Sequence, residues 1–154
     1  MNKLFNIIAA MDFNHGIGCK GKLPWDIKGD LKFFKEITKT SPLIMGRKTW
    51  ESLPVKPLPN RENIVISKKS KMNSLQKALD YCWDKNQIPF IIGGSSIYEE
   101  AINHPNLDGL FLTLIHGAYK SDVFFPAIPE NLKIMLVEHY LNYSIFTFVK
   151  KSTS

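Results

Sequence analysis

The chain has 154 residues, of which 44% are hydrophobic and 22% charged, and its formal net charge is +6. These values are typical of a soluble globular protein and predict a single domain, residues 1–154, with one hydrophobic core. They exclude a membrane-spanning helix, because no apolar run approaches the roughly 20 residues that such a helix needs. Cys19 and Cys82 show no metal-ligand spacing, so we expect two free thiols in a reducing cytoplasm.

The order of apolar runs and amphipathic segments predicts an α/β domain. The strands that we expect from the apolar runs are, in chain order, 4–11, 43–45, 63–67, 88–92, 110–115, 132–139 and 143–149. The helices that we expect between them lie at about 26–39, 47–53, 74–85 and 96–102. Alternation of strands and helices implies a mostly parallel sheet with helices on both faces. The last two strands are joined by a turn without a helix, so they add a C-terminal antiparallel hairpin.

An acid next to an apolar helix face is the first candidate for chemistry. Residues 12–25 predict a long loop that contains glycines, and the helix that follows carries Leu31 and Phe34 on one face. Asp30 borders this face, and a carboxylate beside an aromatic wall suits a flat ligand with a polar edge. The alternative is that Asp30 is an ordinary first-turn acid, which the helix dipole favours by about 0.3–1 kcal/mol.

The positive charges suggest sites for anions. Only two of the 20 basic residues are arginines, Arg47 and Arg61, and we interpret them as two separate anion sites, with surface ion pairs as the alternative. Residues 46–49 and 93–96 each connect a strand to a helix, where backbone N–H groups can approach an anion. With the lysines of 68–71 at a third strand end, these segments suit a long ligand with several phosphates. A tight glycine turn and a solvated surface turn are the alternatives for the last two segments.

The sequence offers no nucleophile or metal centre as a competing source of chemistry. No Gly-x-Ser-x-Gly motif is present, and the four histidines lack metal-ligand spacing. Chemistry supplied by a bound cofactor and one positioned acid is therefore the simplest interpretation.

Several specific motifs occur in a characteristic order along the chain. They are residues 17–18, 23–25, 30–31, 34–35, 44–52, 57–63, 91–94, Thr113 and 122–126. On these motifs the chain resembles the dihydrofolate reductases, in particular the bacterial chromosomal type, over essentially its whole length. The resemblance implies a one-domain, eight-stranded sheet and NADPH-dependent reduction of 7,8-dihydrofolate to tetrahydrofolate for one-carbon metabolism. It also implies a cytoplasmic monomer that binds dihydrofolate and antifolate-type small molecules, and neither nucleic acid nor membranes.

The resemblance implies a role for each matching residue. Asp30 would be the catalytic acid that binds the pterin edge, Thr113 would support it, and Arg61 would bind the α-carboxylate of the glutamate tail. The other substrate-binding residues would be Ile8, Ala9, Leu31, Phe34, Leu53 and Ile92. The cofactor-binding residues would be Ala10, Ile17, Gly18, Gly46, Arg47, Lys48, Thr49, Ser67, Lys68, Lys69, Gly93, Gly94, Ser95, Ser96 and Ile97. The pterin N5 would receive its proton from water, and no metal is expected.

Two further features follow from the resemblance, and two residues depart from it. The peptide bond between Gly93 and Gly94 would be cis, and the loop 12–25 would close over the nicotinamide with the help of Asp122. Leu23 replaces a methionine that many bacterial members carry, which we expect to change only loop dynamics. Lys68 and Lys69 stand where many members have an arginine that binds the 2′-phosphate. Lysine carries a single ammonium group, whereas arginine has a planar guanidinium that can make two parallel hydrogen bonds.

Two other functions compete with this interpretation. One is a reductase of the same fold that acts on a pyrimidine ribosylamino substrate, and the other is a basic nucleotide- or nucleic-acid-binding module without catalysis. Asp30, Phe34 and Arg61 together suit a pterin with a carboxylate tail, which argues against the first. The second would show clustered arginines and exposed aromatic residues, whereas basic residues here lie at strand ends.

Overall fold

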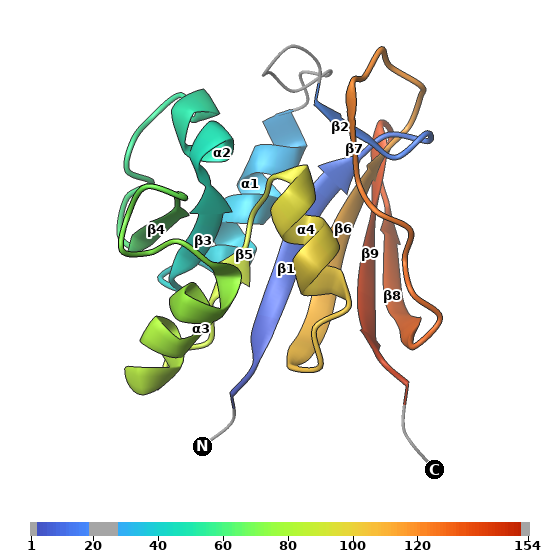
Figure 1. Cartoon of the computed structure of the whole chain (residues 1–154). Coiled ribbons are helices and arrows are strands. Elements are labelled where there is room, and N and C mark those ends of the chain that lie inside the picture. Colours follow the sequence, from blue (N-terminus) through green and yellow to red (C-terminus); the bar gives the residue numbers. More distant parts are fainter. Residues whose placement is uncertain (1–2, 19–27, 152–154) are drawn as a thin grey trace.

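The computed structural model describes residues 3–18 and 28–151, and for residues 28–31 it describes the backbone alone. Its strands are β1 (Phe5–Met11), β2 (Gly16–Gly18), β3 (Leu43–Gly46), β4 (Asn63–Ile66), β5 (Phe90–Ile91), β6 (Leu107–Ile115), β7 (Val123–Phe124), β8 (Leu132–His139) and β9 (Tyr143–Lys150). Seven of them form one sheet in the order β4-β3-β5-β1-β6-β9-β8 (Figure 1). β2 and β7 pair with each other in a separate antiparallel ribbon.

The pairing confirms the predicted α/β class and the C-terminal hairpin. β1 lies parallel to β5 and β6, and β3 lies parallel to β4 and β5, whereas β9 is antiparallel to β6 and β8. The sheet itself differs from the expected eight strands, since in the described part of the chain it has seven. The two short strands of the ribbon pair with each other instead of extending an edge of the sheet.

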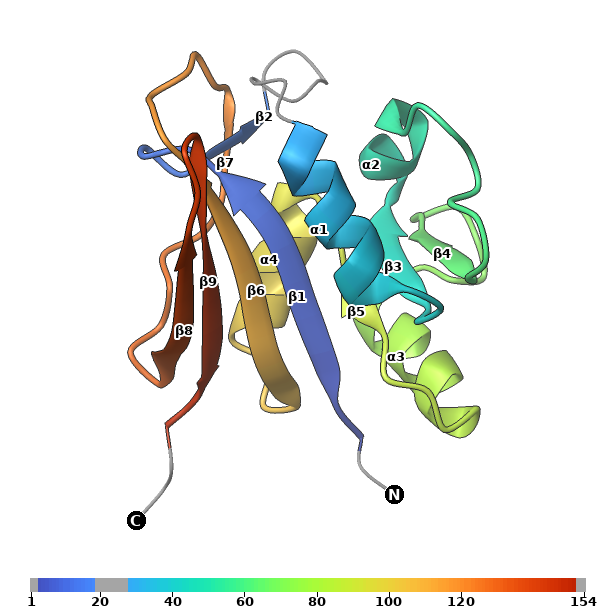
Figure 2. The same cartoon turned by 180° about the vertical axis from the view of Figure 1, so that it is seen from behind.

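Helices cover both faces of the sheet, as predicted. α1 (Lys28–Thr38) lies on one face, and α3 (Leu75–Asp84) and α4 (Ser95–Ile102) lie on the other, as the two opposite views show (Figures 1 and 2). The short helix α2 (Arg47–Ser52) follows β3 without a connecting loop. None of the helices in the described residues has both the length and the apolar character needed to cross a membrane.

The alternation of side chains in β1 explains why the domain has a buried cluster on each face. Ile7 and Ala9 belong to the larger cluster, with residues of α3 and α4, whereas Ile8 belongs to a second cluster with Phe34 of α1. Successive side chains of a strand point to opposite faces, so a central strand that is apolar throughout can serve both. β1 therefore carries Ile8 on the side of the sheet that α1 covers.

Candidate functional site

A long cleft opens at the carboxyl ends of the parallel strands. Its volume is about 2460 Å³, and its walls include the segments that follow β3, β4 and β5 together with the end of β1. Ligands of open α/β sheets bind at this edge. Pockets for one small molecule usually measure about 300–1,000 Å³, so the volume of this cleft exceeds what one small ligand needs.

Most of the predicted site residues line this one cleft. They are Ile8, Ala9, Ala10, Ile17, Gly18, Phe34, Gly46, Arg47, Lys48, Thr49, Leu53, Arg61, Ser67, Lys68, Lys69, Ile92, Gly93, Gly94, Ser95, Ser96 and Ile97. The side chains of Asp30 and Leu31 lie outside the described residues, although their backbone belongs to α1. Thr113 is buried on β6, next to Ala10 of β1, and is not part of the cleft wall. The roles of all these residues remain predictions.

The loop predicted at 12–25 is only partly described. Residues 19–25 lie outside the described part of the chain, so neither Cys19 nor Leu23 can be placed. The first part of the loop forms β2, and the backbone N–H of Asp122 donates to the carbonyl of Gly18 at 2.9 Å. Asp122 thus contacts this segment through its backbone, and its role in holding a closed loop stays a prediction.

One region of the cleft wall is apolar. Ile8, Phe34, Leu53 and Ile92 all line the cleft, and the last three are partly buried and pack against the buried cluster that contains Ile8. Phe34 comes from α1, Leu53 follows the last residue of α2, and Ile8 and Ile92 come from β1 and from the end of the neighbouring β5. A flat ring between such side chains would be shielded from water on both faces, which suits an aromatic heterocycle.

Arg61 contributes a positive charge whose hydrogen-bond partners in the described part of the chain are neutral. Its Nε donates to the carbonyl of Pro59 at 2.8 Å, and its Nη1 donates to the hydroxyl of Thr38 at 2.5 Å. Burial lowers the pKa of Arg61, because desolvation disfavours the charged form. Arginine nevertheless stays protonated at neutral pH, so this guanidinium is suited to bind an anion.

Arg47 differs from Arg61 in its partner. Its Nη1 donates to Glu51 at 2.7 Å, one helical turn later, and both side chains are more than half exposed. The surface ion pair that the sequence left open as an alternative is therefore present. Exposed ion pairs of this kind contribute little free energy, so an anion in the cleft could take the place of Glu51.

The glycines that follow β5 form a close-packed turn at the start of α4. The peptide bond between Gly93 and Gly94 is cis, which confirms the expectation, and the N–H of Gly46 donates to the carbonyl of Gly93 at 2.8 Å. A Cβ atom on Gly93 would lie 3.2 Å from Oγ1 of Thr49 and 3.3 Å from the hydroxyl of Tyr98. The N-cap residue of α4 is Gly94, which has no side chain to cap the first N–H groups of the helix. These donors line the cleft and suit a phosphate.

The donors around the cleft fit NADPH. Three groups of donors line the same cleft. They are the uncapped first N–H groups of α4, the residues 47–49 and the lysines that follow β4. A dinucleotide pyrophosphate needs backbone and side-chain donors together, and a 2′-phosphate needs an additional cation. Lys68 and Lys69 would supply this cation, since they follow β4, which pairs with β3, and line the same cleft.

The sequence did not predict two residues that hold the site in place. The hydroxyl of Tyr98, on the buried face of α4, donates to the carbonyl of Ile8 at 3.0 Å and joins α4 to β1. Thr38 ends α1 and contacts Arg61. A tyrosine on the apolar face of a helix signals that its hydroxyl needs a partner, so Tyr98 could have been singled out. No local pattern connects Thr38 with Arg61.

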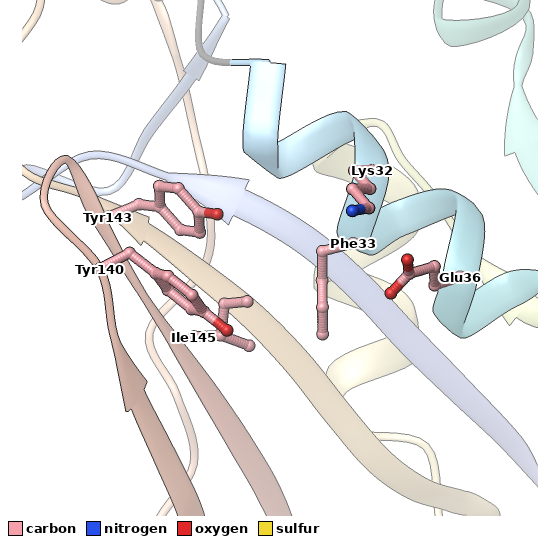
Figure 3. A pocket seen from close by; sticks show the side chains of 6 residues that line it. All are labelled: Lys32, Phe33, Glu36, Tyr140, Tyr143 and Ile145. Atoms are coloured by element: carbon pink, nitrogen blue, oxygen red, sulfur yellow. The ribbon is translucent and has the colours of Figure 1, made fainter.

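A second, smaller hollow lies between α1 and the C-terminal hairpin (Figure 3). It measures about 230 Å³ and is lined by Lys32, Phe33, Glu36, Tyr140, Tyr143 and Ile145. It shares no lining residue with the large cleft. Its side chains carry both signs of charge, so they favour no particular ligand.

Comparison with known proteins identifies the family. A family model described as dihydrofolate reductase matches residues 4–142. The chain is 37% identical to the dihydrofolate reductase of Drosophila melanogaster, over 84% of this chain and 82% of the relative. It is 44% identical to the dihydrofolate reductase of Neisseria meningitidis, over 79% of this chain and 78% of the relative.

Longer proteins are also similar to the chain. It is 35% identical to a bifunctional dihydrofolate reductase-thymidylate synthase of Daucus carota, over 99% of this chain but only 35% of the relative. The chain thus spans about a third of the length of the bifunctional relatives that it matches. From the family match and the two shorter relatives, which it covers over more than two thirds of their length, the chain belongs to the dihydrofolate reductases, a family of NADPH-dependent oxidoreductases of folate metabolism.

Proposed function

We propose that the chain carries out the reaction of its family, the reduction of 7,8-dihydrofolate to 5,6,7,8-tetrahydrofolate with NADPH, in the large cleft. The observation that carries this proposal is the composition of the cleft wall. Apolar side chains and Arg61 suit a flat ring with a carboxylate tail, and uncapped N–H groups with Lys68 and Lys69 suit the cofactor phosphates. Family membership favours this reaction over both alternatives that the sequence left open.

In this proposal the substrate ring lies in the apolar region of the cleft. Phe34 and Ile92 would cover the ring and keep water away from it. Asp30 would bind the 2-amino group and N3 of the pterin, and Thr113 would support its carboxylate. Asp30 and Phe34 are four residues apart on α1, so they share a helix face. The ionised acid would orient the ring and favour its protonated form electrostatically, while a water molecule delivers the proton to N5.

The cofactor would occupy the rest of the cleft. When bound, NADPH supplies the hydride that reduces C6 of the pterin. Ala10, Ile17 and Gly18 would border the nicotinamide, and the residues 46–49 and 93–97 would hold the pyrophosphate. Ser67, Lys68 and Lys69 would hold the 2′-phosphate and make the chain prefer NADPH to NADH.

We further propose a single-domain monomer of the bacterial chromosomal type that works in the cytoplasm. The identity of 44% with the Neisseria meningitidis enzyme supports the type. The buried clusters on both faces of one sheet support a single domain. Light scattering of the purified chain should give the mass of one copy, about 17.6 kDa, and twice that mass would contradict the monomer.

The experiment that tests the function compares the wild type with two variants. The purified chain is mixed with dihydrofolate and NADPH, and the loss of reduced-nicotinamide absorbance is followed. Asp30→Asn should lower kcat at least about a hundredfold, the range for loss of a group that stabilises the transition state electrostatically, whereas the exposed Asp84→Asn on α3 should match the wild type. Full activity of Asp30→Asn would refute the role of Asp30. A wild type that binds NADPH but reduces no dihydrofolate would refute the proposed substrate.

A further inference from the structure

We propose that Thr38 is a positioning residue, which holds Arg61 in the orientation that receives the carboxylate of the substrate tail. This inference rests on the proposed function, because it assigns the tail to Arg61. It concerns a residue that does not line the cleft and that the sequence did not single out.

The hydroxyl of Thr38 both donates one hydrogen bond and accepts another. Thr38 is fully buried at the end of α1, and its Oγ1 donates to the carbonyl of Phe34 at 2.8 Å. A hydroxyl has a single proton, so this donation leaves only its lone pairs for other partners. Oγ1 therefore accepts from Nη1 of Arg61, at 2.5 Å, and it cannot change roles without losing the bond to Phe34.

Arg61 is fixed at two points by neutral groups. In addition to Thr38, its Nε donates to the carbonyl of Pro59 at 2.8 Å. A guanidinium has five N–H groups, so three remain, one on Nη1 and two on Nη2. Both terminal nitrogens can therefore still donate to a carboxylate. The two neutral partners thus restrain the side chain of Arg61, while its positive charge and its remaining N–H groups are left for the ligand.

Because Thr38 and Pro59 already hold Arg61, the protein should bind the carboxylate tail of the substrate more tightly. A free arginine loses rotamer entropy when it binds a carboxylate, whereas a side chain that is already held loses less. The same helix also supplies Phe34, whose side chain lines the apolar region and whose carbonyl accepts from Thr38. One turn of α1 therefore connects the proposed site for the substrate ring, at Phe34, with the proposed site for its carboxylate tail, at Arg61. Thr38 should favour substrates that carry both the ring and the tail.

A purely structural role for Thr38 is the alternative. Threonine near the end of a helix often donates to the carbonyl four residues earlier, and the bond to Phe34 is of this kind. Such a role would affect stability and all substrates alike. The bond to Arg61, which is 23 residues away in sequence, predicts an effect confined to substrates with a carboxylate tail.

The test compares two substrates on matched variants. Dihydrofolate carries the tail, and 6-methyl-7,8-dihydropterin has the same ring without it. Thr38→Val keeps the shape but removes the hydroxyl, Thr38→Ser keeps the hydroxyl, and Thr147→Val on β9 is a control at another buried threonine. Urea unfolding establishes that each variant is folded under the assay conditions.

We expect Thr38→Val to raise KM for dihydrofolate about tenfold, in the range for a hydrogen bond to a charged group, with kcat changed less than about twofold. Its kcat/KM for the dihydropterin should equal that of the wild type, and Thr38→Ser and Thr147→Val should act as wild type on both substrates. In an Arg61→Ala background, Thr38→Val should add nothing to the loss, because the two residues act as a unit.

Three results would overturn the inference. They are an equal loss of kcat/KM on both substrates, an unchanged KM of Thr38→Val for dihydrofolate, and a full additional loss in the Arg61→Ala background. Failure of the proposed function gives a different pattern, since the wild type itself would then reduce neither substrate. A folded Thr38→Val that equals the wild type on the dihydropterin but not on dihydrofolate supports the inference.

Discussion

Replacing Gly93 by alanine should destabilise the protein for reasons that can be read from its backbone and its neighbours. Gly93 has a φ of +128°, a region that L residues rarely adopt and that costs them about 1–3 kcal/mol. The added Cβ would also lie 3.2 Å from Oγ1 of Thr49 and 3.3 Å from the hydroxyl of Tyr98. Tyr98 is held by its bond to the carbonyl of Ile8, so it cannot move away without losing that bond.

The next residue provides a matched control. Gly94 has a φ of −92° and a ψ of −150°, so it lacks the positive φ that strains an L residue at Gly93, and its Cβ would meet only Oγ1 of Thr49, at an ordinary distance of 3.4 Å. Gly93→Ala should therefore unfold with a free energy at least about 1 kcal/mol below that of Gly94→Ala.

Urea unfolding followed by circular dichroism measures this difference. Both variants should keep the wild-type slope of free energy against urea, and only the midpoint of Gly93→Ala should fall clearly. Binding of NADPH, followed by protein fluorescence, should be weakened in Gly93→Ala as well, because Thr49 and the start of α4 must shift. Equal midpoints for the two alanine variants would refute the argument from φ and from the close contacts.

Three further predictions concern other parts of the molecule. Asp12→Ala should lower the free energy of unfolding, measured by urea unfolding, by at least about 2 kcal/mol. This buried carboxylate accepts from three backbone N–H groups at 2.7–2.9 Å, and all three would lose their partner. Asp12→Asn should lower this free energy less. Burial raises the pKa of the Cys82 thiol from 9.0 to about 12. The folded state therefore favours the neutral thiol, and this contribution to stability is complete below pH 9 and lost as the pH rises toward 12. The Tm of Cys82→Ala should fall less than that of the wild type over this pH range. Glu51→Gln should free Arg47 and tighten NADPH binding a few-fold at low salt, as titration would show, and unchanged affinity would argue against a phosphate contact by Arg47.

Local patterns predicted the elements that carry the site, and they failed where an element is short. The strand expected at 88–92 is only Phe90–Ile91, because Pro89 has no N–H to donate and Ile88 is exposed. β6 begins at Leu107, three residues before the expected start, because Leu107 pairs with Phe5 although Asp108 and Gly109 interrupt the apolar run. Such pairing depends on a neighbouring strand and leaves no local signal.

The two-stranded ribbon was not predicted for a similar reason. β2 has three residues and β7 has two, which is too short to show an alternating pattern. Their pairing joins segments that are more than 100 residues apart in sequence. The cis bond between Lys56 and Pro57 was also missed, since an X-Pro sequence allows either isomer and its surroundings select one.

The two arginines show which part of the site the sequence could not supply. Their rarity among lysines suggested two separate anion sites, with surface ion pairs as the alternative. In the structure Arg47 is paired with Glu51, whereas Arg61 is held by Thr38 and Pro59. The i,i+4 spacing of Arg47 and Glu51 is visible in the sequence and could have predicted that pair. The partners of Arg61 could not be foreseen, because Thr38 reaches it only when α1 packs on the sheet. Neutral partners fix a cation without neutralising it, so the charge of Arg61 is available to an anion as it stands, whereas an anion that binds Arg47 would have to displace Glu51.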